Sequence, residues 1–344
     1  MRTDLRRATL AATALALAGP AFGSDVEVAQ ESAPGLGDFD ANVLGTIAML
    51  ASDADVAAYY AYDTTVTESY GGVEPAPVDR RSYLFVHRSS GDCGTALVAL
   101  HDQANSPAGG SFFCSVELLG DPDGAAFLVK DDPDGVGTVP DQYTGSPGSS
   151  SFAADQGWQT CCTDGWAIGP LDGPWETRVE ITQATIGIDG WFAYSATGAE
   201  LPLDLTAGRR VRLRLVSGGA SESSRVGSPP NPDALLPGQT SGPVIGSVWD
   251  PVVDHTSFLP SATLDLLGVS VNPLNVALPP FGTLLCDPTI LITVQTSPAG
   301  VPFAVPLPLD CASVGVTFCA QGASLDAAGS LRFANALDIT IGTY

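Results

Sequence analysis

The sequence has few positive charges. Only 14 of its 344 residues are Lys or Arg, against 38 Asp and Glu, and the formal net charge is −24. A nucleic-acid-binding protein needs a basic surface that releases counterions from phosphates, so this composition excludes that class. Charged residues make up only 15% of the chain and hydrophobic residues 44%, which argues for a folded globular protein rather than a disordered one.

Long apolar runs are also missing after the first 23 residues, where no stretch reaches the roughly 18 residues of a transmembrane helix. Residues 1–23 differ: Arg2, Arg6 and Arg7 precede an apolar stretch, and Ala21-Phe22-Gly23 closes it. This order is typical of a cleavable secretory signal peptide. We therefore expect a secreted protein that acts outside the cell or at its surface, with no membrane insertion after cleavage.

Known catalytic motifs are absent. The sequence has no GxSxG elbow, HExxH helix, Walker loop or full dinucleotide fingerprint. Its three histidines include two with a neighbouring carboxylate, His101-Asp102 and Asp254-His255, but neighbours on a strand point to opposite faces. Pairs of carboxylates for glycoside cleavage stay open because their separation is spatial. A non-enzymatic protein is favoured, and an unrecognised secreted hydrolase is an alternative.

Short candidate strands separated by turn residues fill most of the chain, which has 38 Gly and 27 Pro. Residues 210–215 alternate strictly, with three arginines on one face and Val211, Leu213 and Leu215 on the other. The pattern predicts an all-β protein with two antiparallel β-sandwich domains of jelly-roll or immunoglobulin-like type. The three arginines are interpreted as a solvated face, with binding of an anionic polysaccharide as the alternative.

A small, polar and proline-rich segment suggests a domain boundary. Residues 217–224 read SGGASESS, and residues 227–232 read GSPPNP. We expect a flexible N-terminal segment at 24–35, a larger β-sandwich domain at 36–216, a linker at 217–245 and a smaller β-sandwich domain at 246–344.

Seven cysteines fit an exported protein with disulfides. They are Cys93, Cys114, Cys161, Cys162, Cys286, Cys311 and Cys319. We favour a Cys93–Cys114 bridge, which leaves Cys161 and Cys162 either as a strained vicinal pair or bonded to different partners. The odd number in the second half implies one thiol that is free or intermolecular.

Aspartates gather around the strand predicted at 125–130. Asp-Pro-Asp-Gly occurs at 121–124 and at 132–135, and each copy is typical of a tight hairpin turn. Asp131, Asp132 and Asp134, joined by Asp164, would also supply the oxygen ligands that Ca²⁺ prefers. Neither turn completes an EF-hand. Two hairpin turns are the simpler interpretation, and a calcium site is the alternative.

Four tryptophans, Trp158, Trp166, Trp175 and Trp191, occur within a short interval. Buried tryptophans fill a sandwich core, which is the favoured interpretation, whereas exposed ones stack on sugar rings. Trp166, directly after Asp164-Gly165, is the candidate for ligand binding. Together with the aspartates it gives a second functional hypothesis, a calcium-assisted carbohydrate-binding module.

Residues 247–344 resemble a C-terminal β-rich module in exported proteins of environmental bacteria, through VDHTSF at 253–258, GTLLCDP at 282–288, PLPL at 306–309 and FCAQGAS at 318–324. The first domain is similar to β-rich regions of uncharacterised secreted bacterial proteins, through DDPDG at 131–135 and CCTDG at 161–165 followed by Ile168-Gly169. The resemblance implies export and a β fold. We expect an interaction or extracellular-matrix protein whose partner is an extracellular polysaccharide or a cell-surface protein.

Overall fold

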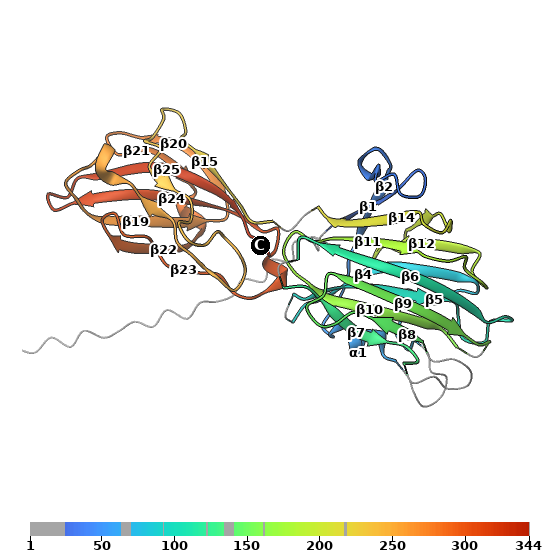
Figure 1. The fold of residues 1–344 in the computed structure, drawn as a ribbon. Helices are drawn as coiled ribbons and strands as arrows, with labels where there is room; N and C mark the ends of the chain where they lie inside the picture. Colours follow the sequence, from blue (N-terminus) through green and yellow to red (C-terminus); the bar gives the residue numbers. More distant parts are fainter. Residues whose placement is uncertain are drawn as a thin grey trace, which may run out of the picture.

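The computed structural model describes residues 25–62, 70–91, 93–121, 123–133, 141–160, 162–216 and 219–343. The fold is all-β, as predicted, and most strand pairs are antiparallel (Figure 1). Two bodies lie side by side, which we call the first sandwich (residues 25–216) and the second sandwich (residues 219–343). The expected signal peptide at 1–23 lies outside the described residues.

The first sandwich contains two large sheets and one short α-helix. Its strands pair in the order β2-β1-β14-β11-β6-β9-β8 in one sheet and β13-β12-β4-β5-β10-β7 in the other, where β3 also pairs with β4. Its elements are β1 (Asp25–Gln30), η1 (Phe39–Ala41), β2 (Val43–Ala48), β3 (Leu50–Ser52), α1 (Val56–Tyr60), β4 (Arg81–Ser89), β5 (Thr95–His101), β6 (Gly110–Leu119), β7 (Ala126–Lys130), β8 (Gln142–Thr144), β9 (Ser151–Trp158), β10 (Asp164–Leu171), β11 (Glu176–Ile181), β12 (Gly190–Tyr194), β13 (Glu200–Leu203) and β14 (Arg210–Leu215).

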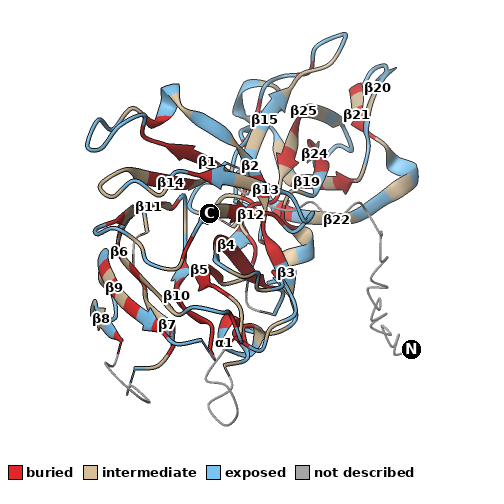
Figure 2. Ribbon diagram, turned by 90° about the vertical axis from the view of Figure 1, so that its right-hand side faces the viewer, coloured by how far each residue is buried: buried red, intermediate tan, exposed pale blue. Residues whose placement is uncertain are grey.

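The main core of the first sandwich lies between its two sheets, where buried segments of both sheets meet (Figure 2). Alternation explains it: Val211 and Leu213 of β14 are fully buried on the face opposite the arginines. The other sheet is buried on its outer face too, because α1 packs there through Val56 and Tyr60. Strands β5 and β10 are therefore almost entirely buried, as continuous apolar runs predict.

The second sandwich is built on one five-stranded sheet of order β15-β25-β24-β19-β22. Trp249, Leu267 and Phe318 belong to the larger core on one side of this sheet, and the hairpin β20-β21 contributes Leu285 to a smaller cluster. Its elements are β15 (Ser221–Arg225), β16 (Leu235–Leu236), β17 (Val248–Trp249), β18 (Val252–Val253), η2 (His255–Ser257), β19 (Ala262–Ser270), β20 (Pro273–Leu278), β21 (Gly282–Cys286), η3 (Pro288–Ile290), β22 (Leu291–Pro298), β23 (Val305–Pro306), η4 (Cys311–Ser313), β24 (Thr317–Asp326) and β25 (Leu331–Thr340).

Two of the expected segment boundaries are wrong. Residues 24–35 were expected to be flexible, but β1 lies between β2 and β14 in the sheet and buries Val26 and Val28 completely. Residues 217–245 were expected to be a linker, but β15 pairs with β25 and Leu235 lies in the core of the second sandwich. In both cases apolar burial and strand pairing outweigh the composition of the segment.

The disulfides also differ from the prediction. Cys93 bonds Cys311, 218 residues away, and thereby joins the two sandwiches, while Cys114 is a buried free thiol. Cys114 points from β6 into the main core, where it behaves as a small apolar residue. The odd cysteine of the second half is thus neither free nor intermolecular. Cys162 is disulfide-bonded, but Cys161 lies outside the described residues, so the vicinal pair stays a prediction.

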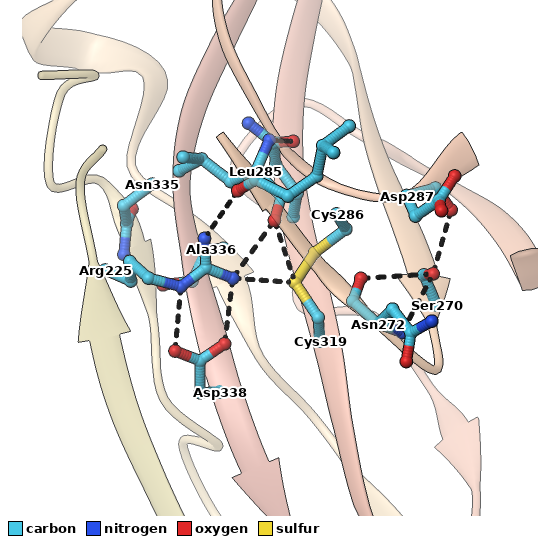
Figure 3. The surroundings of a disulfide bond; sticks show 12 residues. Arg225, Ser270, Asn272, Leu285, Cys286, Asp287, Cys319, Asn335, Ala336 and Asp338 are labelled. Carbon is cyan, nitrogen blue, oxygen red and sulfur yellow. Dashed lines mark hydrogen bonds and ion pairs between the residues drawn. A yellow bond between two sulfur atoms is a disulfide. The ribbon is translucent and has the colours of Figure 1, made fainter. Parts of the chain in front are cut away.

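The second disulfide, Cys286–Cys319, ties β21 to β24 inside the second sandwich (Figure 3). Arg225 of β15 reaches it: its guanidinium donates to both carboxylate oxygens of Asp338 and to the carbonyl of Leu285. Disulfides persist in oxidising compartments, so the two bridges indicate a protein that folds outside the reducing cytoplasm. Within the described chain, no helix is long and apolar enough to cross a membrane.

Candidate functional site: a buried carboxylate cluster

Three aspartates from different segments meet at one end of the first sandwich. Asp131 follows β7, Asp141 precedes β8 and Asp164 begins β10. The β7–β10 pairing places Asp131 beside Asp164, and the Asp131 amide donates to the carbonyl of Gly165. We call Asp131, Asp141 and Asp164 the carboxylate cluster; all three are buried.

Polar groups of the first sandwich hold the cluster. The Tyr60 hydroxyl donates to Asp131 Oδ2 at 2.7 Å, and the Gly157 amide donates to Asp141 Oδ1 at 3.0 Å. Asp164 Oδ1 accepts from Gln156 Nε2 at 2.5 Å and from the Gly165 amide at 2.7 Å. No Lys or Arg side chain pairs with the cluster among the ion pairs of the described residues.

Burial and mutual repulsion determine the charge of the cluster. Loss of solvent raises the pKa of Asp141 to about 6 and raises the pKa of Asp131 and Asp164 well above the usual range for aspartate. The negative charges of neighbouring aspartates raise these pKa values further. Asp131 Oδ1 and Asp164 Oδ2 accept no hydrogen bond in the described structure, and Asp141 and Asp164 can bond each other only when one carries a proton. Protons therefore neutralise part of the cluster near neutral pH.

A chain of hydrogen bonds runs from the cluster into the core. Gln156 Oε1 lies 3.1 Å from His101 Nε2, and His101 Nδ1 lies 2.8 Å from the Ser82 hydroxyl. Because Gln156 Nε2 donates to Asp164, its Oε1 must accept from His101, which fixes the Nε2–H tautomer and leaves Nδ1 to accept from Ser82. Burial lowers the pKa of His101 to about 3, so the imidazole is neutral. Ser82 and His101 are both completely buried, so we assign them a structural role.

The predicted calcium ligands come only partly together. Asp131 and Asp164 share the cluster, whereas Asp132 is half-buried and bonded to the Tyr62 hydroxyl at 2.5 Å. Asp134 lies outside the described residues. Although three aspartates make up the carboxylate cluster, no three His, Cys, Asp or Glu side chains among the described residues are arranged so that they could hold a metal ion. The predicted hairpin turn at 121–124 is wrong, because β6 and β7 belong to different sheets, although Asp121 accepts from the amides of Asp123 and Gly124.

Trp166 does not offer a surface for sugar stacking. It is 0% exposed and lies in the main core of the first sandwich. Trp158, Trp175 and Trp191 are buried in the same core, as the favoured interpretation predicted. The tryptophan basis for a carbohydrate-binding face is therefore missing, because a stacking ring must face solvent.

The arginine face of β14 is less solvated than expected: Arg212 is covered, whereas Arg210 and Arg214 stay partly exposed. Arg212 is 5% exposed and pairs with Glu27 and Asp40 at 2.8 Å each, and Arg214 also pairs with Glu27. The Phe39 ring lies 5.3 Å from the Arg212 guanidinium. The alternation of β14 was predicted correctly, but the segment after β1 folds back over its polar face. Internal carboxylates occupy arginines that could otherwise have bound an anionic polysaccharide.

In His101-Asp102 and Asp254-His255, the imidazole does not pair with the carboxylate next to it in the sequence. Asp102 accepts from Trp158 Nε1 at 3.0 Å while His101 bonds Ser82, as opposite strand faces predict. His255 Nδ1 instead lies 3.8 Å from the buried carboxylate of Asp265.

No family of known proteins matches the chain, and no curated protein is significantly similar to it.

Proposed function

We propose that this is an exported, non-enzymatic interaction protein that acts at the bacterial surface or in the extracellular matrix, with a protein as its partner. The disulfides and the signal-like N-terminal sequence support export. The resemblance of residues 247–344 to modules of exported bacterial proteins points the same way. The polar groups best suited to chemistry, the carboxylate cluster and the Ser82–His101 pair, are enclosed in the first sandwich.

One observation carries the proposal: β22 is an edge strand without charged residues and with exposed apolar side chains. Among the described strands it ends the sheet order of the second sandwich and pairs only with β19, and the register of this pair shifts near Leu291. Its sequence, LITVQTSP, has no charged residue, and Leu291, Ile292 and Val294 are 43%, 60% and 55% exposed. Natural sheets usually protect such an edge with charges, bulges or a covering segment. A partner strand can add to an edge of this kind through backbone hydrogen bonds, with side-chain pockets for specificity.

Partner binding tests this proposal. Labelled protein comprising residues 24–344 is titrated onto intact cells of the producing bacterium before and after protease treatment of the cells. We expect saturable binding that protease abolishes and that Val294→Lys weakens about tenfold or more, because a lysine on an edge opposes strand addition. Val73→Lys makes the same change at an 84% exposed site of the first sandwich and should bind like wild type. Binding that ignores Val294→Lys, or that survives protease, contradicts a strand-adding protein partner.

A further inference from the structure

The two edges of the sheet in the second sandwich differ in charge. The β15 edge carries Glu222 and Arg225, whereas the β22 edge has no charged residue. Ile292 and Val294 of β22 are both more than half exposed. Within the described chain, the backbone of residues 291–297 forms hydrogen bonds to no segment other than β19. Charges on an edge oppose the addition of another strand, so β15 has a protection that β22 lacks.

Net charge limits which molecules can lie against β22. Copies of this protein repel one another, because the formal net charge is −24. Two copies that meet through β22 bring only uncharged residues, Leu291–Pro298 of each chain, into the strand pair. No like charges then face each other between the two strands, and the exposed apolar side chains of both copies lose contact with water. β22 therefore suits a contact between two copies of an acidic chain.

The sequence of β22 also matches itself in the antiparallel direction. In an antiparallel pair with its two-fold axis at Val294, this valine lies opposite the same valine of the second copy. Thr293 then lies opposite Gln295, a polar pair that can hydrogen-bond, and Ile292 lies opposite Thr296. Because the axis is perpendicular to the sheet, the sheets of the two copies join into one continuous sheet. The pair uses the β22 edge of both copies, so the assembly is closed and ends at the dimer.

We propose that β22 pairs with β22 of a second copy in an antiparallel, two-fold dimer that covers this edge until a partner strand replaces it. This inference rests on the proposed function, because it takes β22 as an edge that accepts a strand, and it adds how that edge is covered in the absence of the partner. One pair of edge strands buries less area than a standard protein interface. The dimer is therefore weak, with a Kd of about 10–100 μM, and a specific partner can displace it.

Sedimentation velocity of the protein comprising residues 24–344 tests the dimer. We expect the wild type to be monomeric at about 2 μM and largely dimeric at about 200 μM, and Val294→Lys to stay monomeric at both concentrations. The added lysine reduces the net negative charge and hence the general repulsion between copies, so loss of the dimer reports on the edge itself. Val73→Lys makes the same charge change in the first sandwich and should dimerise like the wild type. A wild type that is monomeric at both concentrations, or equal dimerisation of Val294→Lys, overturns the proposal.

Cross-linking tests the two-fold register. Opposite residues of an antiparallel pair have Cα atoms about 4.5–5.5 Å apart, which is within the span of a disulfide. We expect Val294→Cys to form a disulfide-linked dimer under mild oxidation at the higher concentration, whereas Cys114, the buried free thiol, should not react. Val276→Cys is the matched control, since Val276 of β20 is 43% exposed. Cross-linking of Val276→Cys as fast as that of Val294→Cys contradicts an axis at Val294.

Cell binding distinguishes this inference from the proposed function. The linked Val294→Cys dimer, separated from its unlinked monomer, should bind cells about tenfold or more weakly than that monomer, because both edges are occupied. Equal binding by the two forms would show that pairing does not cover the edge that the partner uses. A wild type that is monomeric at both concentrations but binds cells in a protease-sensitive manner overturns the dimer and leaves the proposed function intact. A dimer with the expected cross-link but no cell binding does the opposite.

Discussion

The two sandwiches bury polar side chains of different chemistry. The first buries the carboxylates of Asp131, Asp141 and Asp164, two of which leave an oxygen without a hydrogen-bond donor. The second buries mainly neutral amides, those of Asn231, Asn335 and Gln321 (Figure 3 shows Asn335), and both oxygens of its buried carboxylate, Asp265, accept hydrogen bonds, from the Gly300 amide and the Ser324 hydroxyl. A carboxylate changes charge with pH and an amide does not, so the two bodies should respond differently to acid.

The buried amides of the second sandwich bond to backbone groups of adjacent segments. Asn335 Oδ1 accepts from the backbone amides of Ala234 and Leu235, and its Nδ2 donates to the Leu235 carbonyl. Gln321 accepts from the Leu285 amide and donates to the carbonyls of Thr283 and Ala334. These side chains give hydrogen-bond partners to buried backbone groups of adjacent segments. Their role is therefore to complete the fold.

The largest effect is expected from Asn335→Ala in the second sandwich. The change leaves the buried amides of Ala234 and Leu235 without an acceptor, at about 1–3 kcal/mol each, so we expect the free energy of unfolding to fall by about 3–5 kcal/mol. The loss should be the same at pH 5 and pH 7.5 because no charge is involved. Urea unfolding followed by circular dichroism measures it.

Asn272→Ala is the matched control, since Asn272 is exposed. It should change the free energy of unfolding by no more than about 0.5 kcal/mol. A loss below about 1 kcal/mol for Asn335→Ala would mean that water or a backbone shift satisfies the two amides, and the contrast between the sandwiches would then rest on the carboxylates alone.

Strands were predictable from alternation and apolar runs. The predicted segments 95–101 and 210–215 coincide with β5 and β14. β1 was missed, although Asp25-Val-Glu-Val28 alternates, because its position next to the expected cleavage site suggested a flexible end. Pairing was less predictable: the spacing of Cys93 and Cys311 contains no sign that two sandwiches meet there. Contacts over 218 residues follow from topology rather than from local pattern.

Two of the three aspartates in the carboxylate cluster were predictable. Asp131 and Asp164 are two of the four predicted calcium ligands, with Asp132 and Asp134, and the structure brings these two together. Asp141 and Gln156 were missed, but Gln156 carried a signal: it follows Phe152 and Ala154 at alternate positions of β9, so it had to face the core. An amide at an inward-facing position indicates a buried polar network. Asp141 carried no such signal, because it precedes a three-residue strand.

A smaller effect of opposite sign is expected from Asp164→Asn. The carboxamide oxygen can still accept from Gln156 and Gly165, and the new NH₂ group can donate to Asp141. A carboxyl whose pKa rises from 3.8 to about 6 on folding, as for Asp141, favours the folded state in its protonated form, so stability falls as pH rises from about 4 to 6. We expect Asp164→Asn to raise the free energy of unfolding by about 1–2 kcal/mol at pH 7.5 and by less at pH 4.5.

Glu74→Gln is the control for this charge change. Glu74 is exposed, so its removal reports only the reduction of the strong overall negative charge. It should stabilise the protein by a few tenths of a kcal/mol at most, as a surface substitution normally does. Equal stabilisation by Glu74→Gln and Asp164→Asn would show that net charge, rather than the buried cluster, controls the pH response.

The smallest effect on stability is expected from added calcium. This experiment tests whether protons or metal ions neutralise the carboxylate cluster of the first sandwich. Protonated carboxyls offer Ca²⁺ little, and the described residues form no group of three metal ligands. We therefore expect millimolar Ca²⁺ and the chelator EGTA to give the same melting temperature at pH 6 by differential scanning calorimetry. Raising the pH to 8 ionises Asp141 and makes the test more stringent. The contradicting result would be a calcium-dependent rise in the melting temperature that Asp164→Asn abolishes and Glu74→Gln preserves. It would mean that a bound cation, which needs the Asp164 carboxylate, neutralises the cluster in place of protons.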